Sequence, residues 1–314
     1  MKLAGWMAGI AIALAAFPWA IGGEYYVNLA SQVLIAAIFA MSLNLLVGYG
    51  GMTSLGHAAY LGVAAYATAW LMLRAGLGPL AAGGAALVVT TIVAAFYGVL
   101  ALRASGLSFL MITLALGQIL WGLAYRWVEM TGGDNGLSVL ARPAPFRIDL
   151  TGATAFYYFT LAVFAVAFVV IMLLVRSPFG ASLTATRDQA RRMSALGHNV
   201  WLVRWMAFVL AGFWGAVSGV LYMYYNNYIS PHALSLTQSA EALLMVIAGG
   251  PSTLLGPVVG AILVVLMKNV ASVYVEHWTL LLGVVFVVIV LFLPDGIVPG
   301  AMRLYQRARR GRRR

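Results

Sequence analysis

The residues that could do chemistry in this 314-residue sequence are few, and their spacing argues against an enzyme. Its two lysines, Lys2 and Lys268, each follow a methionine, so neither completes the G-x-x-x-x-G-K-[ST] loop that holds nucleotide phosphates. The four histidines are scattered, and no H-E-x-x-H or paired-carboxylate spacing occurs. We therefore expect no catalytic residue, no metal site and no cofactor in this chain, and no ATP-binding motif.

One acidic residue, Glu241, lies near the interior of an apolar stretch. A carboxylate there costs roughly 2.5–3.5 kcal/mol on membrane-insertion scales. Glu241 therefore either faces protein or a cavity, or lies at the level of the lipid headgroups. Lys268 also falls in an apolar stretch, and either pairs with Glu241 or extends its amine to the membrane surface. These two residues define one functional alternative, a stand-alone proton-coupled transporter of small solutes.

A polar, basic segment at about residues 177–203 separates two long apolar stretches. Within it, Asp188 precedes Arg192 by four residues, a spacing that favours a helix, and Gly197 is a natural helix stop. Such a helix either docks a soluble partner or lies on the lipid surface, and the residues alone do not decide between the two. The apolar side of the helix would consist of Leu183, Ala190, Met193 and Leu196.

The composition places these residues in a membrane protein. Apolar residues make up 63% of the sequence and charged residues only 9%, whereas about a quarter of the residues of a soluble protein are charged. The apolar stretches are apolar on all sides, which is typical of membrane-spanning helices. There is no cysteine, which excludes disulfides and thiolate metal sites.

We expect an all-α membrane protein, a polytopic helical bundle of about ten transmembrane segments. A single transmembrane domain would cover residues 1–293, with a basic tail at 294–314. The first apolar run, to residue 21, is either a signal peptide or a retained span, and bulky residues at 17–19 favour a retained span. The later spans are expected at about 25–47, 57–73, 79–102, 107–127, 153–175, 204–225, 239–248, 254–275 and 278–293, of which 239–248 is too short to cross without help.

Basic residues predict the orientation of this bundle. With both termini in the cytosol, fourteen of the nineteen lysines and arginines lie inside, including seven arginines between Arg303 and Arg314. This places segment 177–203 in the cytosol and the loop at about 129–152 outside. The basic tail follows an apolar span, so it indicates contact with anionic membrane lipid rather than with a nucleic acid, for which no folded module is present.

Two glycine-rich breaks, at residues 50–55 and 249–254, resemble each other. Paired breaks of this kind can mark discontinuous helices near a transport site, although six positions also match by chance. An equally good reading is close helix packing through small residues, and His57 would then be a helix-end residue. The candidates for a translocation path or hinge are Asn44, Gly50, Gly51, Ser54, His57, Glu241, Gly249 and Gly250.

Four blocks of residues, in order along the chain, resemble a known family. They comprise residues 44–49 with 54–58, 131–133 with 135–137, 177–180 with 187–188 and 195–197, and 249–250 with 256–257. In these blocks the sequence resembles the LivM-type permease subunits of branched-chain amino-acid ABC importers. The resemblance extends from about residue 26 to residue 293.

The resemblance implies a permease subunit for branched-chain or other hydrophobic amino acids in the bacterial cytoplasmic (inner) membrane. It implies as partners two cytosolic ATPases, which use the ATP, a second homologous permease in a heterodimer, and an extracytoplasmic substrate-binding protein. It further implies that residues 182–197 enter a groove on the ATPase, which favours docking over lipid binding. The coupling residues would be Arg187, Asp188, Arg191, Arg192, Leu196 and Gly197.

Overall fold

The computed structural model describes residues 14, 16–19, 23–139, 150–274, 278–293 and 295–303. Most of the predicted first span and the arginines beyond residue 303 lie outside these ranges. The elements in chain order are α2 (Glu24–Asn44), η1 (Leu45–Tyr49), α3 (Ala58–Leu73), α4 (Pro79–Ala101), α5 (Leu107–Arg126), α6 (Val128–Thr131), η2 (Gly133–Asn135), β1 (Leu137–Ser138), α7 (Ala153–Arg176), α8 (Pro178–Ala195), α9 (Val200–Asn226), β2 (Tyr228–Ile229), η4 (Pro231–Leu234), α10 (Leu236–Gly249), α11 (Gly256–Tyr274) and α12 (Trp278–Phe292).

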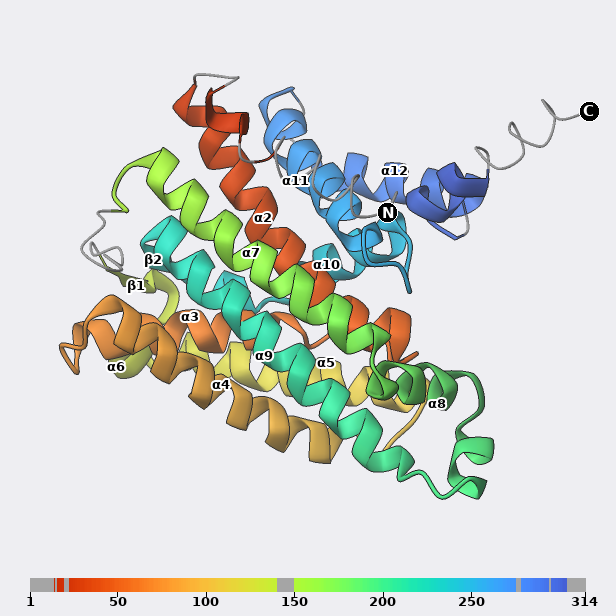
Figure 1. Ribbon diagram of the computed structural model, residues 1–314. Helices are drawn as coiled ribbons and strands as arrows, with labels where there is room; N and C mark the ends of the chain where they lie inside the picture. The colour runs from red at the N-terminus through yellow and green to blue at the C-terminus, as the bar shows by residue number, and fades with distance from the viewer. Residues whose placement is uncertain are drawn as a thin grey trace, which may run out of the picture.

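Two helices, α2 and α9, form the centre of the bundle. Helix α9 packs against α2, α3 and α4, and α2 packs in addition against α7 and α11 (Figure 1). The most apolar windows of α2 and α9 are 72% and 67% buried, whereas those of α4, α5 and α7 are 33% buried or less. The outer helices therefore leave broad apolar surfaces for lipid or for another subunit.

Five of the described helices are long and apolar enough to cross a membrane, namely α2 with η1, α4, α5, α7 and α9. Helices α3 and α10 have only 16 and 14 residues, or roughly 24 and 21 Å at 1.5 Å per residue. Both are shorter than the roughly 30 Å of bilayer hydrocarbon. The chain is an all-α multi-pass membrane protein, while the count of ten crossings, the cytosolic termini and the single domain stay predictions.

Glycine allows the central helices to approach each other closely. A Cβ at Gly219 of α9 would collide with the backbone carbonyl of Leu61 in α3, and one at Gly212 would collide with Ala94 of α4. In lipid, where apolar burial between helices gains little, such close backbone packing is a main source of helix association.

The two polar loops lie at opposite ends of the bundle. Helix α8 lies at one end, and α6, β1 and β2 lie at the other (Figure 1). Strands β1 and β2 pair antiparallel, with Leu137 opposite Ile229 and Ser138 opposite Tyr228. The sequence predicted no strands, because two-residue strands carry no alternating pattern. Opposite ends are what the arginine bias predicts for segments 177–203 and 129–152.

Part of the predicted tail belongs to the packed structure. Residues 297–303 are helical, and Arg303 forms an ion pair with Asp295. A Cβ at Gly296 would collide with the backbone of Gly250. The beginning of the tail thus closes over the second glycine-rich break.

Candidate functional site

The first glycine-rich break begins where α2 loses its regular hydrogen bonding. The helix continues as the π-helical turn η1, in which Gly50 N–H donates to the carbonyl of Leu45. Gly51 then adopts a positive φ of 64°, a conformation that glycine takes without the steric cost other residues bear. Residues 51–56 are not helical, and α3 starts only at Ala58. Single-turn π-helical segments are frequent at functional sites.

This break is inserted among the helices. Gly56 packs so closely on α5 that a Cβ would collide with the carbonyl of Thr113, and the Thr113 hydroxyl accepts a hydrogen bond from Leu55 N–H at 3.3 Å. Ser54 is buried, with 1% of its surface exposed. The amide of Ala58 at the start of α3 donates to Ser239 Oγ of α10 at 3.0 Å.

His57 is completely buried at the end of this break. The Ser42 hydroxyl donates to the carbonyl of Phe39 and lies 2.7 Å from His57 Nε2. Because a hydroxyl has one hydrogen, His57 Nε2 donates to Ser42 Oγ. The ring stacks on Phe39 and meets Tyr60 edge-on. These contacts give His57 a packing role at the start of α3, the helix-end reading of the sequence.

The second break, residues 250–255, has a similar construction. Gly250 and Ser252 have positive φ values of 118° and 62°, and the serine bears a cost of roughly 1–2 kcal/mol in that region. The Thr253 hydroxyl donates to the carbonyl of Gly250 and accepts from Gly256 N–H, which closes the turn before α11.

Asn44 joins the two breaks directly. Its amide nitrogen donates to the carbonyl of Thr253 at 2.9 Å, and its amide oxygen accepts from Ser252 N–H at 3.2 Å. The Ser252 hydroxyl donates to the carbonyl of Gly48 at 2.7 Å. Segments about 200 residues apart in the sequence therefore form one hydrogen-bonded unit, which we call the break junction: Asn44, Gly48, Gly50, Gly51, Gly250, Ser252 and Thr253.

Arg187 of α8 is bound to this junction. Its Nη1 donates to the carbonyl of Gly48 at 2.6 Å and to Ser252 Oγ at 2.8 Å. Its aliphatic stem crosses Gly51, where a Cβ would collide with it. The guanidinium Nε also donates to Asp188 at 2.9 Å. One side chain of the basic segment thus contacts both breaks, and only glycine at residue 51 leaves room for it.

The basic segment is not the single regular helix that the sequence predicted. Gln189 has non-helical angles (φ −149°, ψ 83°), which divide α8 into two helical pieces. The i,i+4 spacing had suggested that Asp188 pairs with Arg192. Because the kink ends the regular spacing, Asp188 instead pairs with Arg187. The predicted helix stop is confirmed, since Gly197 has a φ of 86° just after the helix.

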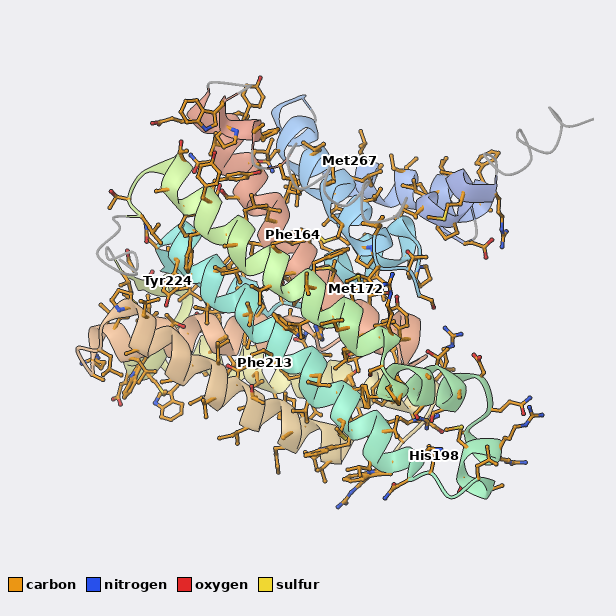
Figure 2. The ribbon with its side chains drawn as sticks, in the orientation of Figure 1. Phe164, Met172, His198, Phe213, Tyr224 and Met267 are labelled. Atoms are coloured by element: carbon orange, nitrogen blue, oxygen red, sulfur yellow. The ribbon has the colours of Figure 1, made fainter. Side chains whose placement is uncertain are left out.

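The second piece of α8 projects from the bundle. Met193 is buried against the molecule, whereas Arg191, Arg192 and Gly197 are exposed. Leu196 is 69% exposed whereas Leu183 is fully buried, so the prediction that the two residues share one side of a helix is wrong. Figure 2 shows His198, in the turn that follows, at the extreme end of the molecule. We call this exposed end the tip of α8; it presents Leu196 next to the positive charges of Arg191 and Arg192.

Glu241 and Lys268 form an ion pair away from the break junction. Lys268 Nζ lies 3.1 and 3.2 Å from the two carboxylate oxygens of Glu241, whose side chain is 6% exposed. A neighbouring hydrogen bond links Asn269 of α11 to Gln32 of α2. The ion pair settles the open choice for Glu241: it faces protein, and Lys268 is its partner.

The structure separates the sequence-predicted residues into four places. Asn44, Gly50, Gly51, Gly249 and Gly250 lie at or beside the break junction. Ser54 and His57 lie deeper along the first break, Glu241 lies in the ion pair, and the second piece of α8 forms the exposed tip. Reasoning from sequence missed Gly48 and Ser252. The similarity of residues 50–55 to 249–254 was a signal for Ser252, because it marked the two segments that meet.

Comparisons with known proteins agree with this architecture. Residues 25–291 match the family described as "Branched-chain amino acid transport system / permease component". The high-affinity branched-chain amino acid transport system permease protein LivM of Salmonella typhimurium is 25% identical over 296 residues, which cover 87% of this chain and 70% of that protein. LivM of Escherichia coli K12 is 26% identical over 300 residues, with the same shares.

A second group of relatives transports a different cargo by name. The autoinducer 2 import system permease protein LsrC of Salmonella paratyphi B is 29% identical over 270 residues, covering 80% of this chain and 72% of that protein. No solved structure matches the chain closely enough for comparison.

Proposed function

Because this chain belongs to the family of branched-chain amino acid transport system permease components, we propose that its basic segment couples ATP hydrolysis by partner subunits to its translocation path. The chain is the permease subunit of an ABC importer. Its cargo is branched-chain or other hydrophobic amino acids, as the names of the LivM relatives suggest. The protein lies in the bacterial inner membrane.

The observation that carries the coupling proposal is the position of Arg187. Its guanidinium contacts both sides of the break junction, while the tip of α8 (Arg191, Arg192, Leu196 and Gly197) extends outward. A movement of the tip would pass along the first piece of α8 to the ends of α2, α10 and α11. Rigid-body shifts of packed helices can then open the path alternately to each side.

The partners follow from the same assignment. Two cytosolic ATPases bind ATP, and one of them receives the tip of α8, so this chain needs no cofactor of its own. A second homologous permease completes the path as a heterodimer. An extracytoplasmic binding protein delivers the cargo to the end of the bundle that carries α6, β1 and β2. The basic residues beyond 303 contact anionic lipid.

Uptake that depends on ATP is the test of this function. The complex isolated from its native membrane with co-purifying subunits, placed in proteoliposomes with its binding protein, should accumulate radiolabelled L-leucine when ATP is present on the ATPase side. A proton ionophore should leave the uptake unchanged. Uptake that requires a proton gradient and no ATP would instead establish a stand-alone proton-coupled carrier.

The double variant Glu241→Gln/Lys268→Met should keep ATP-driven uptake within about twofold of the wild type. The ion pair holds α10 against α11 and takes no part in transport. Replacing both members of a buried ion pair by uncharged groups of similar size is often neutral in stability, whereas removing one member leaves an unpaired buried charge. Uptake per amount of purified complex is the measurement, with Glu241→Gln alone as the comparison. A proton-coupled carrier would lose gradient-driven uptake in both variants.

A further inference from the structure

A cavity of about 450 Å³ opens between α5, η2, η4 and the start of α10. This volume lies within the range of about 300–1,000 Å³ typical of small-molecule sites. One wall is a single face of α5, because its lining residues recur at helical spacing: Leu114, Gln118, Trp121 and Tyr125. The other wall comes from residues 231–237 and from Asp134 of η2.

The cavity reaches well into the membrane-spanning part of the molecule. From Tyr125 to Leu114 it follows eleven residues of α5, or roughly 16 Å along the helix axis. That is about half the roughly 30 Å of bilayer hydrocarbon. Leu236 and Thr237, the first two residues of α10, belong to the wall opposite α5. Asp134 belongs to η2, which lies between α6 and β1 in the chain, so the cavity begins at the end of the bundle that carries these two elements (Figure 1).

The lining combines an apolar surface with polar groups that have no protein partner. Trp121 and Tyr125 stack on each other with ring centroids 5.5 Å apart. Within the described part of the chain, the side chains of Gln118, Asp134, His232 and Thr237 make no hydrogen bond or ion pair. Asp134, His232 and Thr237 are exposed and Gln118 is half-buried, so these groups are accessible to a ligand in the cavity. A few polar groups on a mainly apolar lining are the usual composition of a ligand site.

We propose that this cavity is a cargo-selecting site for a zwitterionic α-amino acid with an apolar side chain, an inference that rests on the proposed function. Asp134 provides the negative charge for the ammonium group. Gln118, His232 and Thr237 provide hydrogen-bond donors for the carboxylate. Leu114, Trp121 and Leu236 contact the side chain. The permease then discriminates among cargoes after the binding protein has released them.

The absence of cysteine from the sequence makes the site directly testable. Gln118→Cys and Thr237→Cys are made in the intact complex, in proteoliposomes, and labelled with membrane-impermeant methanethiosulfonates. L-leucine is the probe ligand. Labelling should slow as leucine increases, by about tenfold at ten times the dissociation constant, and the effect should saturate. Ser138→Cys is the control, because Ser138 of β1 is exposed outside the long apolar helices and does not line the cavity.

If Asp134 faces the cavity, its negative charge should make the labelling rate of Gln118→Cys depend on the charge of the reagent. One unit charge at 4 Å is worth about 1 kcal/mol in water and acts with opposite sign on the two reagents, so the cationic reagent should label Gln118→Cys up to about thirtyfold faster than the anionic one. Asp134→Asn should remove that preference and weaken leucine protection. Both effects require that Asp134 face the cavity.

Three results would overturn the proposal. Leucine could leave the labelling of both cavity cysteines unchanged, or it could slow Ser138→Cys equally. Gln118→Cys could also react in the isolated chain but not in the complex, which would show that the second permease covers the cavity. ATP-driven leucine uptake by the same proteoliposomes reports on the proposed function separately. Intact uptake without protection therefore rejects the cargo site alone.

Discussion

Arg187→Ala should abolish most ATP-driven uptake while leaving the ATPases bound. The variant removes the two hydrogen bonds to Gly48 and Ser252, and bonds of this charged kind contribute about 1.5–3 kcal/mol each. Arg187 is 31% exposed, so solvent screens part of that energy. A net loss of about 1.4 kcal/mol in the link between α8 and the break junction already corresponds to tenfold. We expect leucine uptake per complex to fall at least tenfold while ATP hydrolysis continues.

Arg187→Lys should rescue only part of this loss. A lysine amine is a point charge without the planar fork that lets one guanidinium reach Gly48 and Ser252 and still donate to Asp188. Arg176→Ala is the matched control, because this arginine ends α7 next to α8 and is exposed. The measurement is the ratio of leucine transported to ATP hydrolysed. A ratio equal to that of the wild type in Arg187→Ala would show that the junction does not carry the coupling.

Reversal of charge at the tip of α8, Arg191→Glu/Arg192→Glu, should prevent the ATPases from co-purifying. Both arginines are exposed, lie beside the projecting Leu196 and make no ion pair within the described structure. Like charges brought together at an interface cost several kcal/mol, and a loss of about 4 kcal/mol lowers an association constant by roughly a thousandfold. We expect the permease chain to insert normally and to be recovered without ATPase.

The result differs from that of Arg187→Ala, and the difference separates docking from transmission. Loss of the tip charges should remove the partner, whereas loss of Arg187 should leave the partner in place and uncouple it. Arg103→Glu is the control, since Arg103 is an exposed charge in the loop between α4 and α5. Recovery of ATPase in full amount with the doubly reversed tip would place the contact elsewhere on the chain.

The positions of the spans could be predicted because continuous apolar stretches are long and their ends carry glycine, proline and charge. The predicted spans 107–127 and 153–175 differ from α5 and α7 by a single residue at one end. The packing of the glycine-rich breaks between other helices could not be predicted. Gly56 against Thr113 and Ala58 against Ser239 are contacts between distant segments, and no local pattern encodes them.

The sequence predicted several residues of the candidate site, but it did not predict which groups they contact. Arg187 was singled out for its charge, and a charge in a polar segment was expected to face a partner. Arg187 instead binds both glycine-rich breaks. Gly51 leaves space for its side chain beside the first break, and the Ser252 hydroxyl accepts a hydrogen bond from it at the second. Asn44 was named as a candidate for the translocation path or hinge, but its two hydrogen bonds to Ser252 and Thr253 depend on the fold.

Helical spacing and the kink of α8 both separate Leu196 from Leu183, so the prediction that they share one side is wrong. Thirteen residues at about 100° per residue already place Leu196 roughly 140° around a regular helix from Leu183, which is fully buried. The non-helical angles of Gln189 also change the direction of the second piece, in which Met193 is buried and Leu196 is exposed. No glycine or proline marks residue 189, so the sequence carries no local signal for the turn.

The central claim, that the tip of α8 is seated on an ATPase, is tested most directly by a cross-link from Leu196→Cys. Because the sequence has no cysteine, this variant carries a unique thiol for a photoactivatable maleimide. Leu291→Cys on α12 is the control, with the native side chain 73% exposed against 69% for Leu196. Irradiation of the complex should join the Leu196→Cys chain, and not the Leu291→Cys chain, to the ATPase subunit. No ATPase product from Leu196→Cys, or equal products from both, would contradict the account.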